Sequence, residues 1–593
     1  MPLPNPPRRA ARLSALRSTY FDLLVVGGGI TGCGIARDAA LRGHTVALID
    51  KDDFASGTSS RSSRLIHGGL RYLEHGYLHL VFESSSERRT LLRIAPHLVR
   101  PLEFLWPIYQ GARLPRWKVS AGMALYDALS LFRNVGMHRQ MGRDAVTRRE
   151  RTLLGDGLTG GMRYFDAATD DARLTLANAL SASEAGATVV NHLRLDLLTA
   201  MDASATGGRG VDVLTGDPVE IRARVIVNAA GPWSDSVRRM AGEAIAKSSV
   251  QGSKGAHIAV PRARIGNRRA LTLLHPEDGR VFFVLPAGPA AIIGTTDTFT
   301  DVSADVVRAT EDDVRYLLVA ANHYFPAAAL EKTDVLSAWA GIRPLLPSAG
   351  DGPGSASREH AIVRSDDGTI TITGGKLTTY RRMAAEVVDQ VQRQLGLRPL
   401  PTQTDAQPLP GGDLRGTLDD ELAMARIALD DDATRAEQLV HAYGSRWREV
   451  DALCRSSKAM GAKVAAGLGY QMGEMAWAVE HEMAETLGDL LIRRTHVAFE
   501  TADHGVVAAA KVVKVVAPLL GWSEEQCVAQ LAAYVAEVDR IFTIEGAKVR
   551  KRRGPRKKAA VEGVVPETES GDEAEGPSSP DAGFMPDDRQ HWR

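Results

Sequence analysis

The sequence predicts an α/β protein in which a discontinuous, mainly parallel sheet carries an inserted antiparallel sheet and is followed by a helical domain. An apolar strand, a glycine turn and a helix follow one another in residues 21–50, and apolar strands that end in glycine turns recur in residues 224–233 and 369–391. Residues 245–335 alternate apolar and polar side chains, which is typical of an antiparallel sheet with one covered face. Residues 415–545 show helical spacing. We therefore expect one α/β sheet built from segments far apart in the chain.

Length and composition indicate a folded protein with several domains. The chain has 593 residues, of which 44% are hydrophobic and 24% are charged, so it is too long for one core and can bury a large ligand. Its 72 basic and 72 acidic residues cancel, and no overall field recruits nucleic acid. We expect no nucleic-acid partner, and any electrostatic recognition must be local.

Cysteine usage and the start of the chain indicate a cytoplasmic protein. The 3 cysteines (Cys33, Cys454 and Cys527) lie far apart, which excludes a disulfide scaffold and a metal cluster held by cysteine alone. The first 20 residues are basic and proline-rich but lack the apolar run of a signal peptide. No segment reaches the roughly eighteen apolar residues that a membrane span needs.

The turn after the first strand has a dinucleotide-binding pattern. Gly27, Gly29 and Gly32 fit G-x-G-x-x-G between an apolar strand and a helix, and Asp50 ends the next strand. The glycines permit a tight turn and close approach of a pyrophosphate, and the helix N-terminus supplies N–H groups. The carboxylate can bind both ribose hydroxyls and repels a 2′-phosphate. Two further residues complete the predicted loop: Gly28 and Thr31.

The course of the chain beyond this turn favours FAD over NAD. An NAD domain would continue as a compact six-strand unit, whereas this chain leaves after two strands and returns near residues 225 and 370. The sequence has no second G-x-G-x-x-G between an apolar strand and a helix to hold a nicotinamide, so electrons should come from a substrate bound at the flavin. The other predicted FAD contacts are Thr58, Ser59, Ser60, Ser62, Ser63, Gly68, Gly69, Gly231, Gly375, Lys376, Leu377 and Thr378.

A series of motifs resembles one family of flavoenzymes. In order, over roughly residues 20–395, the motifs are DLLVVGGGITGCGIARDAALRG, SGTSSRSSRLIHGGLRYLE, DDARLTLANA, KGAHIAVPR, IIGTTDT, AGIRPLL, SREHAI and GGKLTTYR. Together they resemble the FAD-dependent sn-glycerol-3-phosphate dehydrogenases of the aerobic, quinone-linked type, and the helical part through about residue 540 is similar to that family's C-terminal domain. Ala256 departs from the pattern, in which a small hydroxyl residue is expected beside the histidine.

The resemblance implies a flavoprotein of glycerol metabolism that oxidises sn-glycerol 3-phosphate to dihydroxyacetone phosphate by hydride transfer to FAD and passes the electrons to a quinone. It also implies peripheral association with the inner face of the cell membrane. A glycerophosphate oxidase that uses oxygen would share these motifs, so the electron acceptor stays open, as does the oligomeric state, for which a homodimer is one option. A flavin-binding interaction or sensor protein without catalysis is the more remote alternative.

Two histidines are candidates for the catalytic base. Oxidation of a secondary alcohol needs a base within hydrogen-bond reach of the hydroxyl, and a histidine suits neutral pH. His67 is the first candidate and His257 the second. The resemblance places RLIHGGLRY over the flavin, with His67 facing the reacting hydroxyl. Either histidine could instead be a core residue that orients other groups.

A group of basic residues is predicted to hold the substrate phosphate. A phosphate dianion needs fork-shaped donors, and Arg71, Arg343 and Arg358 are assigned to it, with Lys376 completing the cluster. The resemblance adds Tyr72 to this phosphate site. Arg343 could also stabilise the developing alkoxide. Any one arginine alone could form a structural ion pair, but the whole set in motif positions favours a phosphate site and argues against a protein without catalysis.

No metal site is expected. The HEMAE segment at residues 481–485 is half of a zinc motif, but its fifth residue is glutamate, so a solvated helix face is the better interpretation.

Residues 102–133 mix aromatic and basic side chains, for which buried core is the default and a membrane-dipping face is the alternative. Residues 548–558 contain eight basic side chains, and nine acidic ones follow.

The predicted domain boundaries follow from these segments. They are residues 1–19 for an N-terminal extension; 20–85, 160–244 and 336–397 for the FAD-binding domain; 86–159 and 245–335 for the substrate domain; 398–414 for a linker; 415–545 for the helical domain; and 546–593 for a disordered charged tail.

Overall fold

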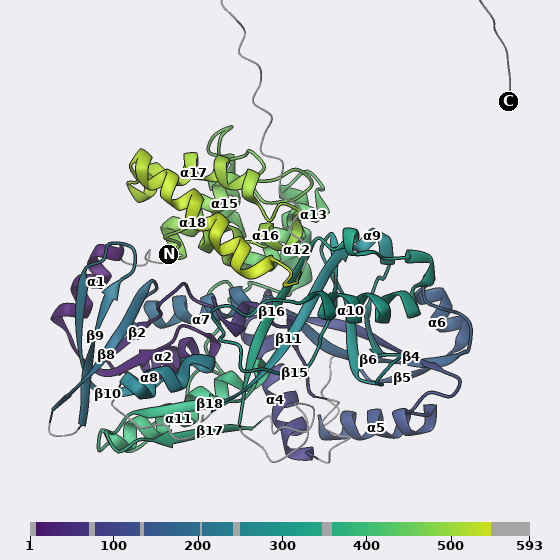
Figure 1. Cartoon of the computed structure of the whole chain (residues 1–593), viewed down its shortest axis with the longest axis horizontal. Helices are drawn as coiled ribbons and strands as arrows, with labels where there is room; N and C mark the ends of the chain where they lie inside the picture. Colours follow the sequence, from purple (N-terminus) through teal and green to yellow (C-terminus); the bar gives the residue numbers. More distant parts are fainter. Residues whose placement is uncertain are drawn as a thin grey trace, which may run out of the picture. The chain divides into compact units, whose positions relative to one another are not determined.

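Two β-sheets and a group of C-terminal helices make up the structure, a computed structural model (Figure 1). It describes residues 8–69, 77–130, 136–201, 204–240, 250–346 and 359–546. Arg71, Tyr72, Arg358 and the tail beyond Gly546 lie outside these residues. The roles predicted for them therefore stay predictions.

The described residues form these elements. The strands are β1 (Tyr20–Val26), β2 (Val46–Ile49), β3 (Leu65–Ile66), β4 (Val99–Tyr109), β5 (Arg139–Gly142), β6 (Leu158–Thr169), β7 (Thr188–Val190), β8 (Leu193–Met201), β9 (Ser204–Asp212), β10 (Pro218–Asn228), β11 (Gln251–Pro261), β12 (Ala270–Leu274), β13 (Val281–Ala287), β14 (Ala290–Gly294), β15 (Thr298–Phe299), β16 (Ser337–Leu345), β17 (His360–Arg364) and β18 (Ile370–Gly374). The α-helices are α1 (Arg9–Ser18), α2 (Ile30–Leu41), α4 (Leu78–Ile94), α5 (Arg116–Leu129), α6 (Arg143–Arg149), α7 (Asp171–Glu184), α8 (Ser234–Met240), α9 (Arg262–Ile265), α10 (Glu311–Tyr324), α11 (Tyr380–Gln394), α12 (Leu418–Ala428), α13 (Ala433–Tyr443), α14 (Trp447–Arg455), α15 (Met472–His481), α16 (Val497–Glu500), α17 (Val506–Leu520) and α18 (Glu524–Phe542). Short helical turns are η1 (Thr58–Ser60), η2 (Gly231–Trp233), η3 (Pro326–Ala328), η4 (Lys332–Asp334), η5 (Leu377–Thr379), η6 (Gly444–Arg446) and η7 (Asp489–Arg494).

The first sheet has eight strands and includes the strand before the glycine turn. Its parallel centre runs β18-β10-β1-β2-β7, with β17 antiparallel at one edge and the β8-β9 hairpin paired to β10. Leu23 and Val25 of β1 pack on the side of α2, α7 and α11, whereas Leu24 and Val26 face the core that includes Leu16 of α1. Because both faces are covered, the strands are apolar runs.

The second sheet has ten strands, in the order β15-β11-β14-β13-β12-β4-β6-β3, with β16 paired to β11 and β5 to β6. Its neighbours are antiparallel except for β4 and β12. One face packs with α10, and the other packs with the C-terminal helices, where Trp339 of β16 meets Phe499 of α16 edge to face. The predicted α/β class, with two sheets and a helical region, is confirmed.

Three strands lie in a different sheet from the one that the predicted boundaries imply. The ranges 20–85, 160–244 and 336–397 place β3, most of β6 and all of β16 in the FAD-binding domain, but these strands pair within the second sheet. All three are largely buried, so their apolar pattern does not reveal which sheet they join. The other predicted boundaries stay predictions.

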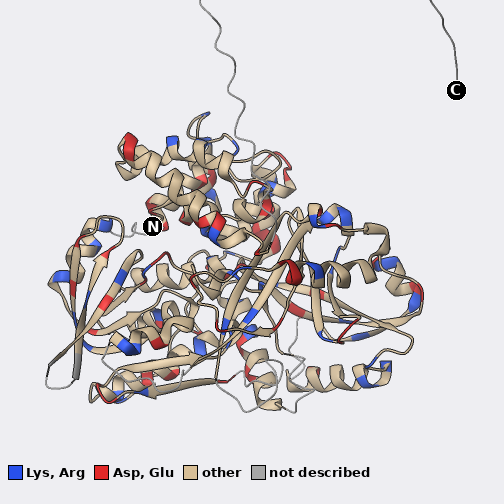
Figure 2. Cartoon of the chain, viewed as in Figure 1, with Lys and Arg blue, Asp and Glu red and all other residues tan. Residues whose placement is uncertain are grey.

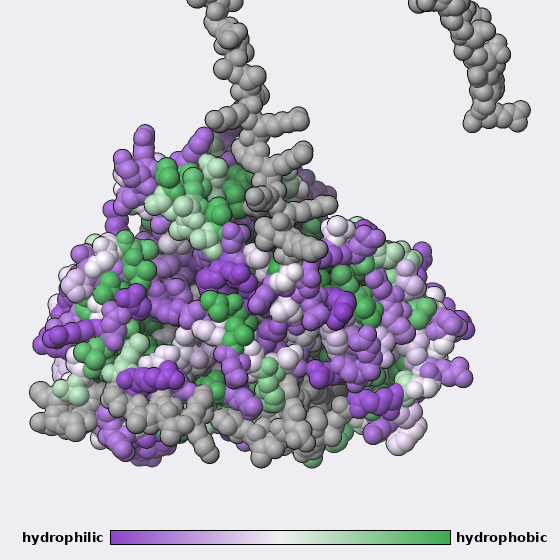
Figure 3. All heavy atoms as spheres, viewed as in Figure 1, coloured by the Kyte–Doolittle hydropathy of each residue, from purple (hydrophilic) through white to green (hydrophobic). Residues whose placement is uncertain are grey.

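The surface of the described chain has charges of both signs side by side and only scattered apolar patches (Figure 2 and Figure 3). Lys and Arg are interspersed with Asp and Glu (Figure 2), as the neutral composition leads one to expect. Apolar residues form scattered patches, one of them over α17 and α18, where Val507 and Val528 are exposed (Figure 3). Within the described residues, no helix combines the length and the apolar character that crossing a membrane requires.

Candidate active site

A cavity of about 350 Å³ lies at the carboxyl ends of the parallel strands of the first sheet. This is where open α/β sheets bind their ligands, and the volume is in the range of small-molecule sites. It brings together segments from four parts of the chain that the sequence assigned to FAD. The predicted residues that line it are Gly27, Gly29, Thr31, Asp50, Thr58, Ser59, Gly231, Gly375, Lys376 and Leu377.

The glycine turn is shaped by close backbone contacts. Gly27 has φ +113°, and a Cβ there would lie 2.6 Å from the carbonyl oxygen of Ala229. A Cβ on Gly32 would lie 1.8 Å from the carbonyl oxygen of Gly27. Helix α2 can therefore start directly beneath the turn and aim its N-terminal N–H groups at the cavity. The backbone N–H of Ile30 donates to the hydroxyl of Ser59 over 3.0 Å.

Asp50 lies at the end of β2, in the wall of the cavity. Its carboxylate accepts hydrogen bonds from the N–H groups of Gly28 at 2.6 Å and Asp52 at 2.8 Å. Burial, followed by the charge of Asp52, raises the pKa of Asp50 to about 7. The fixed carboxyl and the helix N-terminus are the donor and acceptor set that a ribose and a pyrophosphate require, so the residues fit FAD.

Next to the part of the cavity wall formed by residues 374–377, two motifs that are far apart in sequence lie together. The hydroxyl of Thr378 donates to the carbonyl oxygen of His67 over 3.3 Å, and Lys376 Nζ donates to the hydroxyl of Ser84 over 3.5 Å. Gly375 has φ +84°, a backbone conformation that favours glycine. RLIHGG and GGKLTTY are thus neighbours.

His257 lies on β11, buried against the ring of Trp339. The two rings stack with centroids 5.5 Å apart, and Nε2 of the histidine lies 2.9 Å from the hydroxyl of Ser63. Burial, with the charges of Arg343 and Arg64, lowers the pKa of His257 to about 3. The imidazole is therefore neutral at physiological pH.

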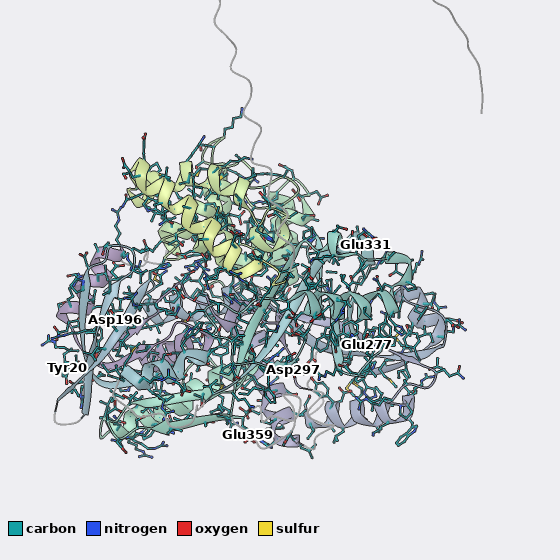
Figure 4. The ribbon with its side chains drawn as sticks, in the orientation of Figure 1. Tyr20, Asp196, Glu277, Asp297, Glu331 and Glu359 are labelled. Carbon is teal, nitrogen blue, oxygen red and sulfur yellow. The ribbon has the colours of Figure 1, made fainter. Side chains whose placement is uncertain are left out.

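Arg343 lies on the adjacent strand, β16, and its guanidinium is held by the chain entering β15. Nη1 is 3.2 Å from the carboxylate of Asp297, which is labelled in Figure 4, and Nη2 donates to the hydroxyl of Thr295 over 3.0 Å. A Cβ on Gly255 would lie 2.3 Å from Nη2. The glycine of KGAH therefore makes room for the guanidinium.

Ala256, the departure from the family pattern, has no bearing on the histidine side chain. Its own side chain is fully buried in the apolar core of the second sheet. Successive residues of a strand point to opposite faces, so a hydroxyl at this position would not face the imidazole of His257. The hydroxyl that does so belongs to Ser63.

The remaining predicted cofactor residues do not line the cavity. The hydroxyl of Ser62 donates to Asp171 over 2.7 Å, at the start of α7. Gly68 is packed so closely that a Cβ would lie 2.1 Å from the hydroxyl of Tyr126. Its N–H donates to Asp166 over 3.0 Å. The other predicted residues outside the lining are Gly28, Gly32, Ser60, Ser63, Gly69 and Thr378.

Sequence reasoning missed the group beneath Gly68. Asp166 of β6 also accepts a hydrogen bond from Tyr126 over 2.7 Å and forms an ion pair with Arg88, all of them buried. The three side chains come from α4, α5 and β6. The one acid of β6 was the available signal, and residue spacing does not indicate its partners.

A buried group of Asp53, His192 and Asp489 offers ligand atoms within 4.8 Å of one another. Arg493 and Arg494 form ion pairs with these acids, including Arg494 Nη1 to Asp53 at 2.5 Å. Guanidinium groups already neutralise the carboxylates, so an ion-pair network accounts for the cluster.

Comparisons with known proteins agree with this geometry. Residues 22–381 match the FAD dependent oxidoreductase family, and residues 402–527 match the C-terminal domain of alpha-glycerophosphate oxidase. The chain is 38% identical over 540 residues to a glycerol-3-phosphate dehydrogenase of Synechocystis, covering 88% of this chain and 96% of that one. It is 34% identical over 537 residues to an aerobic glycerol-3-phosphate dehydrogenase of Staphylococcus aureus, covering 88% and 94%. The crystal structure of a Bacillus halodurans glycerol-3-phosphate dehydrogenase complexed with FAD superposes with TM-score 0.75 at 32% identity, covering 91% of this chain and 98% of that one.

Proposed function

The chain belongs to the family of FAD-dependent glycerol-3-phosphate dehydrogenases, and from this premise we propose that it oxidises sn-glycerol 3-phosphate to dihydroxyacetone phosphate and delivers the electrons to a quinone. It is an oxidoreductase and uses FAD. The observation that carries the proposed site is the pairing of β11 with β16, which puts a neutral imidazole, His257, in the field of a fork-shaped cation, Arg343.

The neutral state of His257 supports a role as base. A neutral imidazole can accept the proton of the substrate hydroxyl, whereas a protonated one cannot. Burial and, after it, the charge of Arg343 lower the pKa of His257, which weakens it as a base. A phosphate dianion bound at Arg343 would offset the charge of Arg343 and so raise the pKa of His257. Binding of the substrate would thus make His257 a stronger base.

Arg343 would bind the substrate through two parallel donors. The Arg343 side chain is 24% exposed, and its guanidinium is paired with the carboxylate of Asp297. We assign the phosphate or the developing alkoxide to this guanidinium. Lys376 in the cavity wall is the second described cation of the predicted cluster, and Arg71, Tyr72 and Arg358 remain assigned from the sequence alone.

FAD supplies the hydride acceptor when it is bound, and the chain's residues supply orientation and proton transfer. His67 stays an alternative base, since its carbonyl bond to Thr378 places its backbone beside the GGKLTTY turn. Anaerobic mixing with sn-glycerol 3-phosphate tests the function directly. Bleaching of the flavin absorbance and formation of dihydroxyacetone phosphate are expected, and an unchanged flavin spectrum would overturn the proposal.

The electron acceptor is proposed to be a quinone, with oxygen as the second candidate. Residues 402–527 match a domain of alpha-glycerophosphate oxidase, and this match supports the oxidase reaction as the second candidate. Turnover in air with and without a soluble quinone separates the two. Stoichiometric quinol with little hydrogen peroxide supports the proposal, and stoichiometric peroxide that quinone does not suppress supports the oxidase.

An apolar surface on α4 and α5 supports peripheral membrane association. Trp117 and Leu125 of α5 are 72% and 43% exposed, and Leu78 and Phe82 of α4 are 43% and 47% exposed. Residues four or eight apart share one side of a helix, and the two helices pack against each other. We call these four residues the apolar face and propose that it dips into the lipid surface from which quinone is drawn.

A further inference from the structure

Arg64, in the RLIHGG motif, has a backbone conformation that needs outside support. Its φ is +55°, in the left-handed region that a residue with a Cβ rarely adopts. Its N–H donates to the hydroxyl of Ser62 over 3.0 Å, and its carbonyl oxygen accepts from the N–H of Thr169 over 2.9 Å. Such a conformation persists only where the surroundings over-determine it, and it is typical of functional sites.

Side chains of the C-terminal helical part supply that support. The guanidinium of Arg64 lies over the ring of Phe499 at 5.0 Å, and its Nη2 lies 3.2 Å from Nδ1 of His496. Nε2 of His496 lies 2.7 Å from the carboxylate of Asp170, which caps α7 through the N–H of Arg173. His496 thus bridges the active-site motif and a helix of the first sheet.

Only one assignment of hydrogen-bond donors and acceptors fits the contacts from Arg64 through His496 to Asp170. An arginine can only donate hydrogen bonds, so Nδ1 of His496 accepts from Arg64. The ring proton is then on Nε2 and is donated to Asp170. This order fixes the orientation of the His496 ring and, through it, the guanidinium of Arg64.

The residue before Arg64 is Ser63, whose hydroxyl contacts Nε2 of the buried His257 over 2.9 Å. We propose that His496 is a positioning residue for catalysis: by holding Arg64 in its left-handed conformation, it sets Ser63 against His257 and so orients the imidazole. The helical part, matched to a separate family domain, then contributes to the reaction as well as to the core. The proposal rests on the proposed role of His257 as base.

Replacement of His496 tests the proposal. His496→Ala removes both hydrogen bonds, whereas in His496→Gln the amide can still accept from Arg64 and donate to Asp170. His481→Ala is the matched control, because His481 is also a half-buried histidine of the helical part but stacks on Trp477. Two readouts are needed: the rate of flavin reduction at saturating substrate, and hydrogen exchange of the backbone amides of residues 62–68 in the purified full chain without substrate.

His496→Ala should slow flavin reduction about 10- to 100-fold, since a displacement of about 1 Å in a catalytic group can cost about 10²-fold. It should also speed amide exchange in residues 62–68, while His496→Gln restores most of both and His481→Ala changes neither. Equal effects of His496→Ala and His481→Ala, or no better rate with glutamine than with alanine, would overturn the positioning role.

A second variant keeps the test decisive if His496→Ala does not fold. Asn is as good a helix cap as Asp, so Asp170→Asn preserves α7 but presents an amide N–H to Nε2 of His496. The ring must then take the other tautomer and oppose Arg64 with an N–H, so flavin reduction should slow about tenfold. Wild-type reduction by Asp170→Asn would overturn the proposal. If His257→Asn itself leaves reduction unchanged, the base is misassigned and both proposals fail together.

Discussion

The guanidinium of Arg343 lies 3.2 Å from the carboxylate of Asp297, and that carboxylate also accepts a hydrogen bond from Ser253 over 2.5 Å. Asp297 is almost fully buried, whereas the side chain of Arg343 is 24% exposed. The acid, together with the hydroxyl of Thr295 that accepts from Nη2, therefore fixes the guanidinium in place. A cation fixed in this way is suited to a bound anion, because little side-chain entropy is lost on binding.

Arg343→Lys should lower kcat/KM for sn-glycerol 3-phosphate about 10- to 100-fold with little change in FAD content. Lysine keeps the charge but loses the fork, and one charge-assisted contact is worth about 1.5–3 kcal/mol. Arg269→Lys is the control, since Arg269 pairs with Glu103 on the same sheet. Steady-state kinetics and flavin absorbance check both variants. Near-wild-type kinetics of Arg343→Lys would remove Arg343 from the substrate site.

His257→Asn should slow flavin reduction at saturating substrate by about 10²- to 10⁴-fold, because a base acts on the chemical step. The dissociation constant for the substrate should change much less. Rapid mixing under anaerobic conditions measures both quantities. His67→Asn is made in parallel. If His67→Asn abolishes reduction and His257→Asn does not, the base assignment is exchanged.

The FAD of the purified protein should be tightly held but not covalently bound, since the Gly27, Gly32 and Asp50 set is complete and no attachment motif is recognisable. Acid precipitation should release the yellow colour into the supernatant. Gly32→Ala should abolish binding, because its Cβ would lie 1.8 Å from a backbone oxygen. Gly155→Ala, which meets nothing within 4 Å, is the control. A yellow pellet would instead mean covalent attachment.

The sequence predicted those parts of the site that are local in the chain. The glycine turn, Asp50 and the GGKLTTY turn line the cavity as expected, since a strand, a tight turn and a helix start within a few residues of one another. The contact of Ser63 with His257 joins residues 194 positions apart, and that of Arg64 with His496 joins residues 432 apart. Such contacts depend on strand pairing and domain packing, which residue spacing does not encode. For the same reason the sequence did not reveal the sheet to which β3, β6 and β16 belong.

His192 should stabilise the folded protein more at pH 6 than at pH 9. Burial alone would lower the pKa of His192, but the carboxylate of Asp489, 2.9 Å away, outweighs it and raises that pKa. A group with a raised pKa contributes stability below its unfolded pKa of about 6.5, and this contribution is lost as the pH rises through the folded value. His192→Gln should therefore cost about 1–3 kcal/mol at pH 6 and less at pH 9.

Urea unfolding of wild type and His192→Gln at the two pH values measures that difference. His323→Gln is the control, because His323 is an exposed residue of α10. Its effect should be small. An equal loss for His192→Gln at pH 6 and pH 9 would mean that His192 is neutral in the folded protein.

Trp117→Glu together with Leu125→Glu should weaken co-sedimentation with anionic liposomes at low and at high salt. Both side chains belong to the apolar face, and insertion of charge there opposes burial in lipid regardless of screening. Turnover with a soluble dye acceptor should be unchanged. The control is Val507→Glu, an exposed apolar position on α17, outside the apolar face. Unchanged co-sedimentation by the double variant would show that the apolar face is not the membrane contact.

Truncation after Gly546 should weaken the same co-sedimentation only at low salt. The removed chain begins with eight basic residues between positions 548 and 558, and each can contribute about 1 kcal/mol near an anionic surface, less as salt rises. The nine acidic residues that follow can neutralise this run, so the tail is expected to assist the apolar face and not to replace it. Dye turnover should be retained. Unchanged co-sedimentation would leave the folded part as the whole membrane contact, and lost dye turnover would mean that the tail supports the fold.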